Sequence, residues 1–204
     1  MSGEIEQPSA GDDDLADMIA EFDTGKRSPT GVSTQILWGV PIAWALFQLW
    51  YVFPVPYIFN VGLFNSTEAR SIHLAFAIFL AFLVFPAFKT SPRAYTPLMD
   101  WVLAFIGAAS AAYIFIIYRA LPERPGLPTT EDVVFSVVGI LMVLEATRRA
   151  LGPPLMIVAI VFMIYSFGGA HMPEIIAHQG PSLKKGMSHY LLTTEGVFGV
   201  ALGA

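Results

Sequence analysis

The sequence predicts an all-α integral membrane protein with about five transmembrane helices. Of its 204 residues, 55% are hydrophobic and 13% are charged, and the mean hydropathy is +0.61. Soluble domains carry about 25% charged residues, so this composition indicates a chain built into a lipid bilayer. The apolar residues fall into successive runs separated by prolines, glycines and charges, each close to the roughly 20 residues that cross a bilayer as a helix.

Residues 1–34 are predicted to form a polar N-terminal tail. Leu15, Met18, Ile19 and Phe22 recur at helical spacing, which indicates a short amphipathic helix over residues 13–22. The tail holds eight of the sixteen acidic residues, so the net charge of −5 comes largely from it and indicates no nucleic-acid partner. No basic segment leads directly into an apolar stretch, so no cleaved signal peptide is expected.

The first three membrane helices are expected over residues 35–53, 70–85 and 100–118. Prolines follow the first two, where a helix ends. The third helix carries a stripe of small residues that permits close helix approach. It is therefore expected at the centre of the bundle. The stripe consists of Ala104, Ala108 and Ala112, with Gly107 and Ala111 beside it.

Residues 144–154 form a charged island between two apolar runs, residues 133–144 and 154–167. Extending the first run through Arg149 and starting the second at Pro153 gives the fourth and fifth predicted helices, residues 133–149 and 153–167. Gly152 and the two following prolines end one helix and begin the next, which predicts a tight hairpin at a membrane surface. Glu145 precedes Arg148 and Arg149 by three and four residues. That spacing predicts an intrahelical ion pair, with direct participation in ion transport as the alternative.

The predicted organisation is a tail (residues 1–34), a four-helix unit (residues 35–150) and an incomplete segment (residues 151–204). The final apolar stretch, residues 187–204, leads us to expect that the polypeptide continues. Basic residues in short loops favour a cytoplasmic N-terminus. The cytoplasmic set is then Lys26, Arg27, Lys89, Arg93, Arg148 and Arg149, and the external set is Arg70, Arg119, Arg124, Lys184 and Lys185.

Chemical motifs are few, and no catalytic, substrate-binding, cofactor-binding or metal-binding residue is predicted. The chain has no cysteine. The triplet at residues 23–25 resembles that of aspartic proteases but precedes a membrane helix, and residues 25–28 do not complete a P-loop. His73 is expected to pack between helices, because no facing haem ligand is visible. His171, His178 and His189 lack zinc-site spacing. The chain is therefore not expected to be an enzyme.

Seven segments together resemble the fused permeases of TRAP transporters, typically of the TAXI type, in which the small and large membrane components form one chain. The match covers nearly the whole sequence. The segments are DTGKR (23–27), PTG (29–31), TEARSIHLAF (67–76), DWVLA (100–104), RPGLPTT (124–130), LEATRRALGPP (144–154) and LLTTEGVFG (191–199).

The resemblance implies a symporter of the bacterial or archaeal cytoplasmic membrane that imports an organic anion, such as a carboxylate. An extracytoplasmic solute-binding protein delivers the substrate, and an ion gradient, usually sodium, drives uptake. Residues to about 150 would be the four-helix scaffold, and residues from about 151 would begin the large component. The substrate and sodium sites would lie in the remainder of the large component, outside this sequence.

A second hypothesis is a membrane anchor or redox-complex subunit unrelated to transport, for which stoichiometric haem would be the sign. Under the transporter hypothesis, the external loops at residues 54–70 and 119–130 are the candidates for docking the binding protein. Arg119 and Arg124 lie in the second of them.

Overall fold

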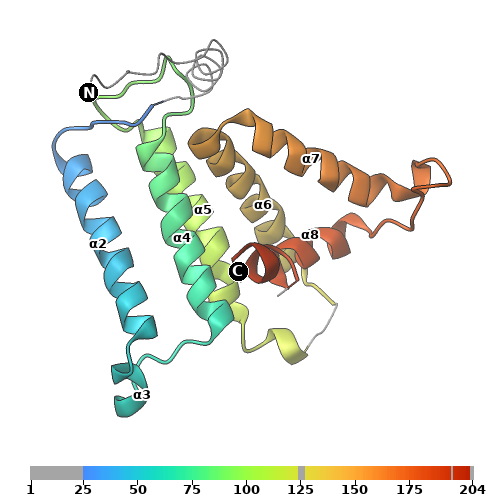
Figure 1. The fold of residues 1–204 in the computed structure, drawn as a ribbon, viewed down its shortest axis with the longest axis horizontal. Coiled ribbons are helices and arrows are strands. Elements are labelled where there is room, and N and C mark those ends of the chain that lie inside the picture. The colour runs from blue at the N-terminus through green and yellow to red at the C-terminus, as the bar shows by residue number, and fades with distance from the viewer. Residues whose placement is uncertain (1–24, 124–126, 194, 203–204) are drawn as a thin grey trace, which may run out of the picture.

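The computed structural model describes residues 25–123, 127–193 and 195–202, and every regular element in these ranges is helical (Figure 1). The predicted amphipathic helix at residues 13–22 lies outside the described residues. The longer helices are α2 (Val32–Val52), α4 (Ser66–Val84), α5 (Leu98–Ile117), α6 (Thr130–Leu151), α7 (Pro153–Gly168) and α8 (Leu183–Leu192). The shorter ones are α3 (Val55–Phe59), η1 (Leu121–Glu123), η2 (Gly169–His171) and the π-helix η3 (Val197–Ala201).

In the described part of the chain, four helical segments are long and apolar enough to cross a membrane: α2, α4, α5 and α7 continued through η2. The prediction of an all-α membrane protein is therefore confirmed at this level. Helix α6 is not among the four, because it carries Glu131 and Asp132 in its first turn and Glu145, Arg148 and Arg149 near its end. A fifth span at α6 stays a prediction.

Every predicted bound of the five apolar helices lies within four residues of the observed one. The largest differences are at helix starts, where a polar cap lies upstream of the apolar run. Asn65 caps α4, with its side chain accepting from the Glu68 amide at 2.9 Å and the Glu68 carboxylate accepting from the Asn65 amide. Thr129 and Asp132 form the same reciprocal cap at the start of α6. Such caps satisfy amides that the helix itself leaves without acceptors.

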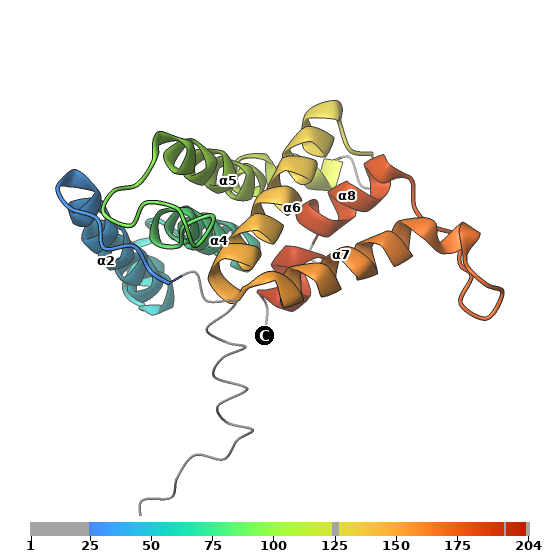
Figure 2. The same ribbon diagram turned by 90° about the horizontal axis from the view of Figure 1, so that it is seen from above.

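Helices α2, α4 and α5 run side by side, and α6 and α8 pack on the other side of the α4–α5 pair (Figures 1 and 2). Helix α4 contacts α2, α5, α6 and η3. It therefore holds the central position that the sequence assigned to α5.

The small residues of α5 do allow a close approach, but they serve two surfaces. A methyl group added at Gly107 would lie 2.5 Å from the Cγ2 atom of Ile78 on α4. Ala104 and Ala111 are also buried. Ala108 and Ala112 instead line an apolar groove between α2, α4 and α5. The small residues therefore indicated tight packing correctly for only some of their positions.

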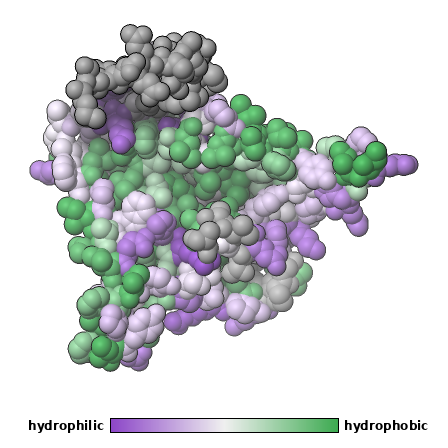
Figure 3. All heavy atoms as spheres, in the orientation of Figure 1, coloured by the Kyte–Doolittle hydropathy of each residue, from purple (hydrophilic) through white to green (hydrophobic). Residues whose placement is uncertain are grey.

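The predicted helix break between α6 and α7 is confirmed, and its position at a membrane surface stays a prediction. Gly152 has a φ of +86°, which L side chains rarely adopt, and Pro153 and Pro154 open α7. From this turn α7 leads away from α6 at a wide angle, and none of its residues is buried (Figures 1 and 2). Its apolar surface shows as green in Figure 3. Of the two longer helices that follow this turn, α7 and α8, helix α7 is therefore the less buried.

The chain then returns to the bundle through α8. Leu191 of α8 fits against Gly139 of α6, where a methyl group on the glycine would lie 2.7 Å from the leucine Cδ2 atom. Leu191, Leu192 and Phe198 belong to the same buried hydrophobic cluster as α4, α5 and α6. The predicted division of the chain at residue 150 is not tested by this packing and stays a prediction.

Candidate functional site

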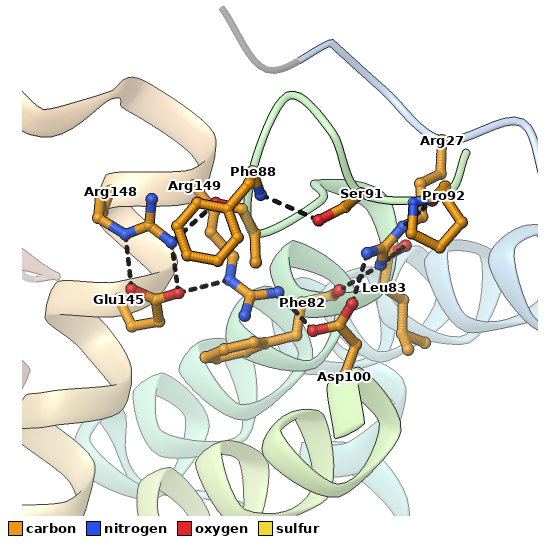
Figure 4. A network of polar contacts seen from close by, with 11 residues as sticks. Arg27, Phe82, Leu83, Phe88, Ser91, Pro92, Asp100, Glu145, Arg148 and Arg149 are labelled. Carbon is orange, nitrogen blue, oxygen red and sulfur yellow. Dashed lines mark hydrogen bonds and ion pairs between the residues drawn. The ribbon is translucent and has the colours of Figure 1, made fainter. Parts of the chain in front are cut away.

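Charged side chains from three separate segments meet at the end of the bundle where α4 ends and α5 begins (Figure 4). We call this set the charge cluster. Arg27 comes from the extended segment before α2, Asp100 from the first turn of α5, and the rest from the last two turns of α6. Its members are Arg27, Asp100, Glu145, Arg148 and Arg149.

Asp100 is the centre of the charge cluster. Its Oδ2 atom accepts a hydrogen bond from Nη2 of Arg27, and its Oδ1 atom accepts one from Nη1 of Arg149 at 2.8 Å. All three side chains are almost entirely buried, with 4–5% of each residue exposed. Removing one partner from such a group leaves a buried charge without compensation, which typically costs about 3–5 kcal/mol.

Arg27 also holds the end of α4. Its Nη1 atom donates to the carbonyl oxygens of Phe82 and Leu83 at 3.1 and 3.3 Å, and its backbone N–H donates to the carbonyl of Val84 at 2.9 Å. The last carbonyls of a helix have no intrahelical partner and carry partial negative charge. A buried guanidinium at this place therefore satisfies them and fixes the extended segment against α4.

Glu145 joins the other two arginines and confirms the predicted ion pair. Its Oε1 atom accepts from Nε of Arg149 and from Nη2 of Arg148, both at 2.7 Å, and its Oε2 atom accepts from Nε of Arg148 at 2.7 Å. Arg148 also donates to the carbonyl of Ala87 at 3.0 Å, in the loop after α4. The pair thus does more than stabilise α6, because it ties that helix to Asp100 and to the α4–α5 loop.

Aromatic rings complete the surroundings of the arginines. The Arg149 guanidinium carbon lies 4.6 Å from the centre of the Phe82 ring, and that of Arg148 lies 5.4 Å from the centre of the Phe88 ring. Both distances suit cation–π attraction. The three arginines and two carboxylates are mutually bonded, which makes the arrangement suited to fixing four chain segments together rather than to chemical catalysis.

The structure also relates the charge cluster to the predicted topology. The loop between α4 and α5 carries Lys89 and Arg93, and backbone N–H groups of Ser28 and Thr30 donate to the carbonyls of Arg93 and Ala94 at 3.1 and 3.2 Å. The six basic residues assigned to the cytoplasmic side therefore gather at this one end.

No family model, curated protein or solved structure matches this chain. Function must accordingly be argued from the residues themselves.

The histidines do not come together. His73 of α4 accepts a hydrogen bond from Nε1–H of Trp44 on α2 at 3.3 Å, so it lies between packed helices as expected. His178 lies against the ring of Tyr165, and His189 is 3.8 Å from a carboxylate oxygen of Glu195. Among the described residues, no group of three or more potential metal ligands is found.

Two further predictions concern the loops. Arg119 is exposed, as a docking residue would be, whereas Arg124 and residues 23 and 24 lie outside the described part of the chain. Asp132 was not predicted from the sequence; it is 1% exposed and accepts a 2.7 Å hydrogen bond from Tyr113 on α5. A weak signal existed, because Asp132 stands three residues after Thr129, the spacing of a helix cap.

The sequence analysis also missed the roles of Asp100 and Arg27. Asp100 is an acid at the opening of a long apolar helix, a position that predicts a cationic partner. The partner could not be chosen from sequence, because Arg27 and Arg149 are 73 and 49 positions away.

Proposed function

We propose that this chain is the scaffold portion of a TRAP-type secondary transporter that takes up an organic carboxylate. The transporter would be a symporter of the bacterial or archaeal cytoplasmic membrane, with the N-terminus of this chain inside. The remainder of the large permease component would hold the substrate and the coupling ion, which we expect to be sodium. An extracytoplasmic solute-binding protein would deliver the substrate.

The observation that carries the proposal is the buried charge cluster. A transport domain that moves through the membrane needs a fixed partner, and mutually bonded buried charges oppose relative movement of the segments that carry them. The cluster joins the extended N-terminal segment, the end of α4, the start of α5 and the end of α6. These contacts favour a static frame over a moving part.

The resemblance supports the same proposal in a specific way. Three of the segments that resemble the fused permeases are residues 23–27, 100–104 and 144–154. In the fold, these segments supply all five members of the charge cluster. Segments that look related to the permeases thus form one physical unit.

The unpartnered apolar surfaces fit a chain that joins a larger membrane assembly. Helix α2 has no buried residue and contacts the bundle mainly through α4, and α7 has no buried residue either. Both surfaces suit lipid or the helices of the large component. The basic residues gathered at the charge-cluster end favour that end as cytoplasmic by the positive-inside rule.

The proposal is tested with the chain tagged at its N-terminus in its native membrane. We expect the tag either on a polypeptide several times larger than 22.2 kDa or in a stable complex with a large multi-span membrane protein. Vesicles from these cells should accumulate radiolabelled organic carboxylates when a sodium gradient and the periplasmic fraction are supplied. Deleting the chain should abolish this uptake.

A companion experiment tests the docking loop. Replacing Arg119 by Gln should weaken uptake that depends on the binding protein while protein level stays constant, because Arg119 is exposed on the predicted external side. Lys89→Gln, on the opposite side, is the control. A purified chain that carries stoichiometric haem, with uptake unchanged by its deletion, would contradict the transporter proposal.

A further inference from the structure

A cavity of about 290 Å³ lies at the end of the bundle opposite the charge cluster, between the last turns of α2 and the first turns of α4. Its polar wall comes from Gln48 and Tyr51 on α2 and from Ser66, Arg70 and His73 on α4, with Phe47 on its apolar side. Small-molecule pockets span about 300–1,000 Å³, so the space suits a small polar group with a short apolar body.

Among the described residues that line this cavity, Arg70 supplies the only charge. One guanidinium nitrogen donates to the carbonyl of Phe198 at 2.8 Å, and no carboxylate of the described residues lies within ion-pair distance of it. Glu68, the nearest acid in sequence, is engaged in the cap of α4 with Asn65. A guanidinium offers five N–H donors, so most of those of Arg70 remain for a ligand.

His73 adds a second donor. Nε1–H of Trp44 can only donate, so the Nδ1 atom of His73 that receives it carries no proton. Gln48 contacts the same nitrogen. The neutral ring then carries its proton on Nε2, and no partner for Nε2 is found among the described residues.

A second groove between α2, α4 and α5 shows what distinguishes this cavity. That groove is of similar size, about 270 Å³, but it is lined by apolar residues such as Val40, Phe76 and Ala108. It needs nothing beyond lipid chains or neighbouring helices to cover it. The polar cavity instead gathers a cation and neutral donors, and none of its described lining residues is an acid.

We propose that the cavity beside Arg70 binds an oxyanion, with Arg70 as the ion-pair partner and Nε2–H of His73 as a second donor. An anionic phospholipid headgroup and a free organic carboxylate or phosphate share this chemistry. The proposal requires only the cavity and a membrane setting, so it does not rest on the transporter function.

The test uses the full chain in a neutral maltoside detergent. Native mass spectrometry measures retention of dioleoylphosphatidylglycerol against dioleoylphosphatidylcholine, and calorimetry measures binding of succinate and of inorganic phosphate. Preferential retention of one phosphatidylglycerol indicates a lipid ligand, whereas binding of succinate or phosphate indicates a free anion. In either case Arg70→Gln should weaken binding at least about tenfold, the factor that one charge-assisted hydrogen bond supplies.

Two further variants make the result decisive. Ser66→Phe places a ring in the cavity from an exposed position and keeps Arg70, so it should also abolish binding and remains informative if Arg70→Gln fails to fold. Lys184→Gln removes an exposed cation that does not line the cavity and should leave binding unchanged. The proposal is overturned if none of the anionic probes binds in preference to phosphatidylcholine, or if Ser66→Phe binds them like the unmodified chain.

Discussion

At the end of the bundle where α5 begins, three arginines meet two carboxylates, whereas at the end where α4 begins, Arg70 lines a cavity whose described wall residues include no acid. Helix α4 reaches both ends, because it begins beside the cavity and ends at the charge cluster. The first end satisfies its charges internally and binds four chain segments together. The second leaves hydrogen-bond donors toward an open space. A charged side chain at a helix end adds rigidity when its partner lies within the fold. The same kind of side chain is available for binding a ligand when the fold supplies no such partner.

The largest expected effect comes from removing the centre of the charge cluster. Asp100→Asn should destabilise the protein by about 3–5 kcal/mol, because Arg27 would keep a buried charge without a carboxylate and Arg149 would keep only that of Glu145. Unfolding of the chain in lipid nanodiscs, followed by circular dichroism, measures this. Glu131→Gln is the matched control, an exposed acid in the first turn of α6 that should change stability by less than about 1 kcal/mol. Equal effects of the two variants would show that the cluster adds no rigidity.

The second effect concerns the helices that connect the two ends. Gly107→Ala should destabilise by about 1–3 kcal/mol, because the new methyl group would overlap the buried Ile78 side chain. Gly39→Ala on α2 meets nothing within 4 Å and should be neutral or stabilising by up to about 1 kcal/mol. The same unfolding measurement applies. If Gly107→Ala behaved like Gly39→Ala, the α4–α5 contact would be looser than the packing indicates.

A smaller effect is expected from the buried hydrogen bond at the cavity end. Tyr113→Phe keeps the ring stacked on Phe135 but removes the donor to Asp132, at a cost of about 1 kcal/mol. Tyr165→Phe removes an exposed hydroxyl that donates to the carbonyl of Ile176 in the loop after η2, and it should cost less than about 0.5 kcal/mol. If Tyr113→Phe lowered the free energy of unfolding as much as Asp100→Asn, the two ends would be equally rigid and the contrast between them would disappear.

The smallest effect should appear at the outer edge of the charge cluster. The side chain of Arg148 is 21% exposed and that of Glu145 is 28% exposed, whereas that of Arg149 is 3% exposed. Solvent weakens the outer pair, so Arg148→Gln should cost about 1 kcal/mol or less. Arg149→Gln, one residue further on, should cost several times more. Equal losses would show that the cluster has no buried centre.

The sequence predicted the helices well because their ends depend on local chemistry. Apolar runs, prolines and the glycine at position 152 are all visible within a few residues, and so is the i, i+3 and i, i+4 spacing of Glu145 with its arginines. The charge cluster as a whole was not predictable in this way, because Arg27, Asp100 and Arg149 meet only after α4, α5 and α6 have packed.

The directions of α7 and α8 could not be predicted from the sequence either. An apolar run gives the length of a helix but not its direction, which depends on what packs against it. Hydropathy therefore could not tell that α7 leaves the bundle or that Leu191 returns to Gly139. The cavity beside Arg70 likewise depends on residues from two helices and on the returning segment at Phe198.

The central claim is that the charge cluster holds four segments as one rigid unit, and hydrogen exchange tests it most directly. The N–H groups of Arg27, Ser28 and Thr30 donate to carbonyls of Val84, Arg93 and Ala94. In the full chain in nanodiscs, Asp100→Asn should raise exchange at all three amides and at the end of α6 together, while the start of α4 beside the cavity stays protected. Unchanged exchange at residues 27–30 in that variant would contradict the claim.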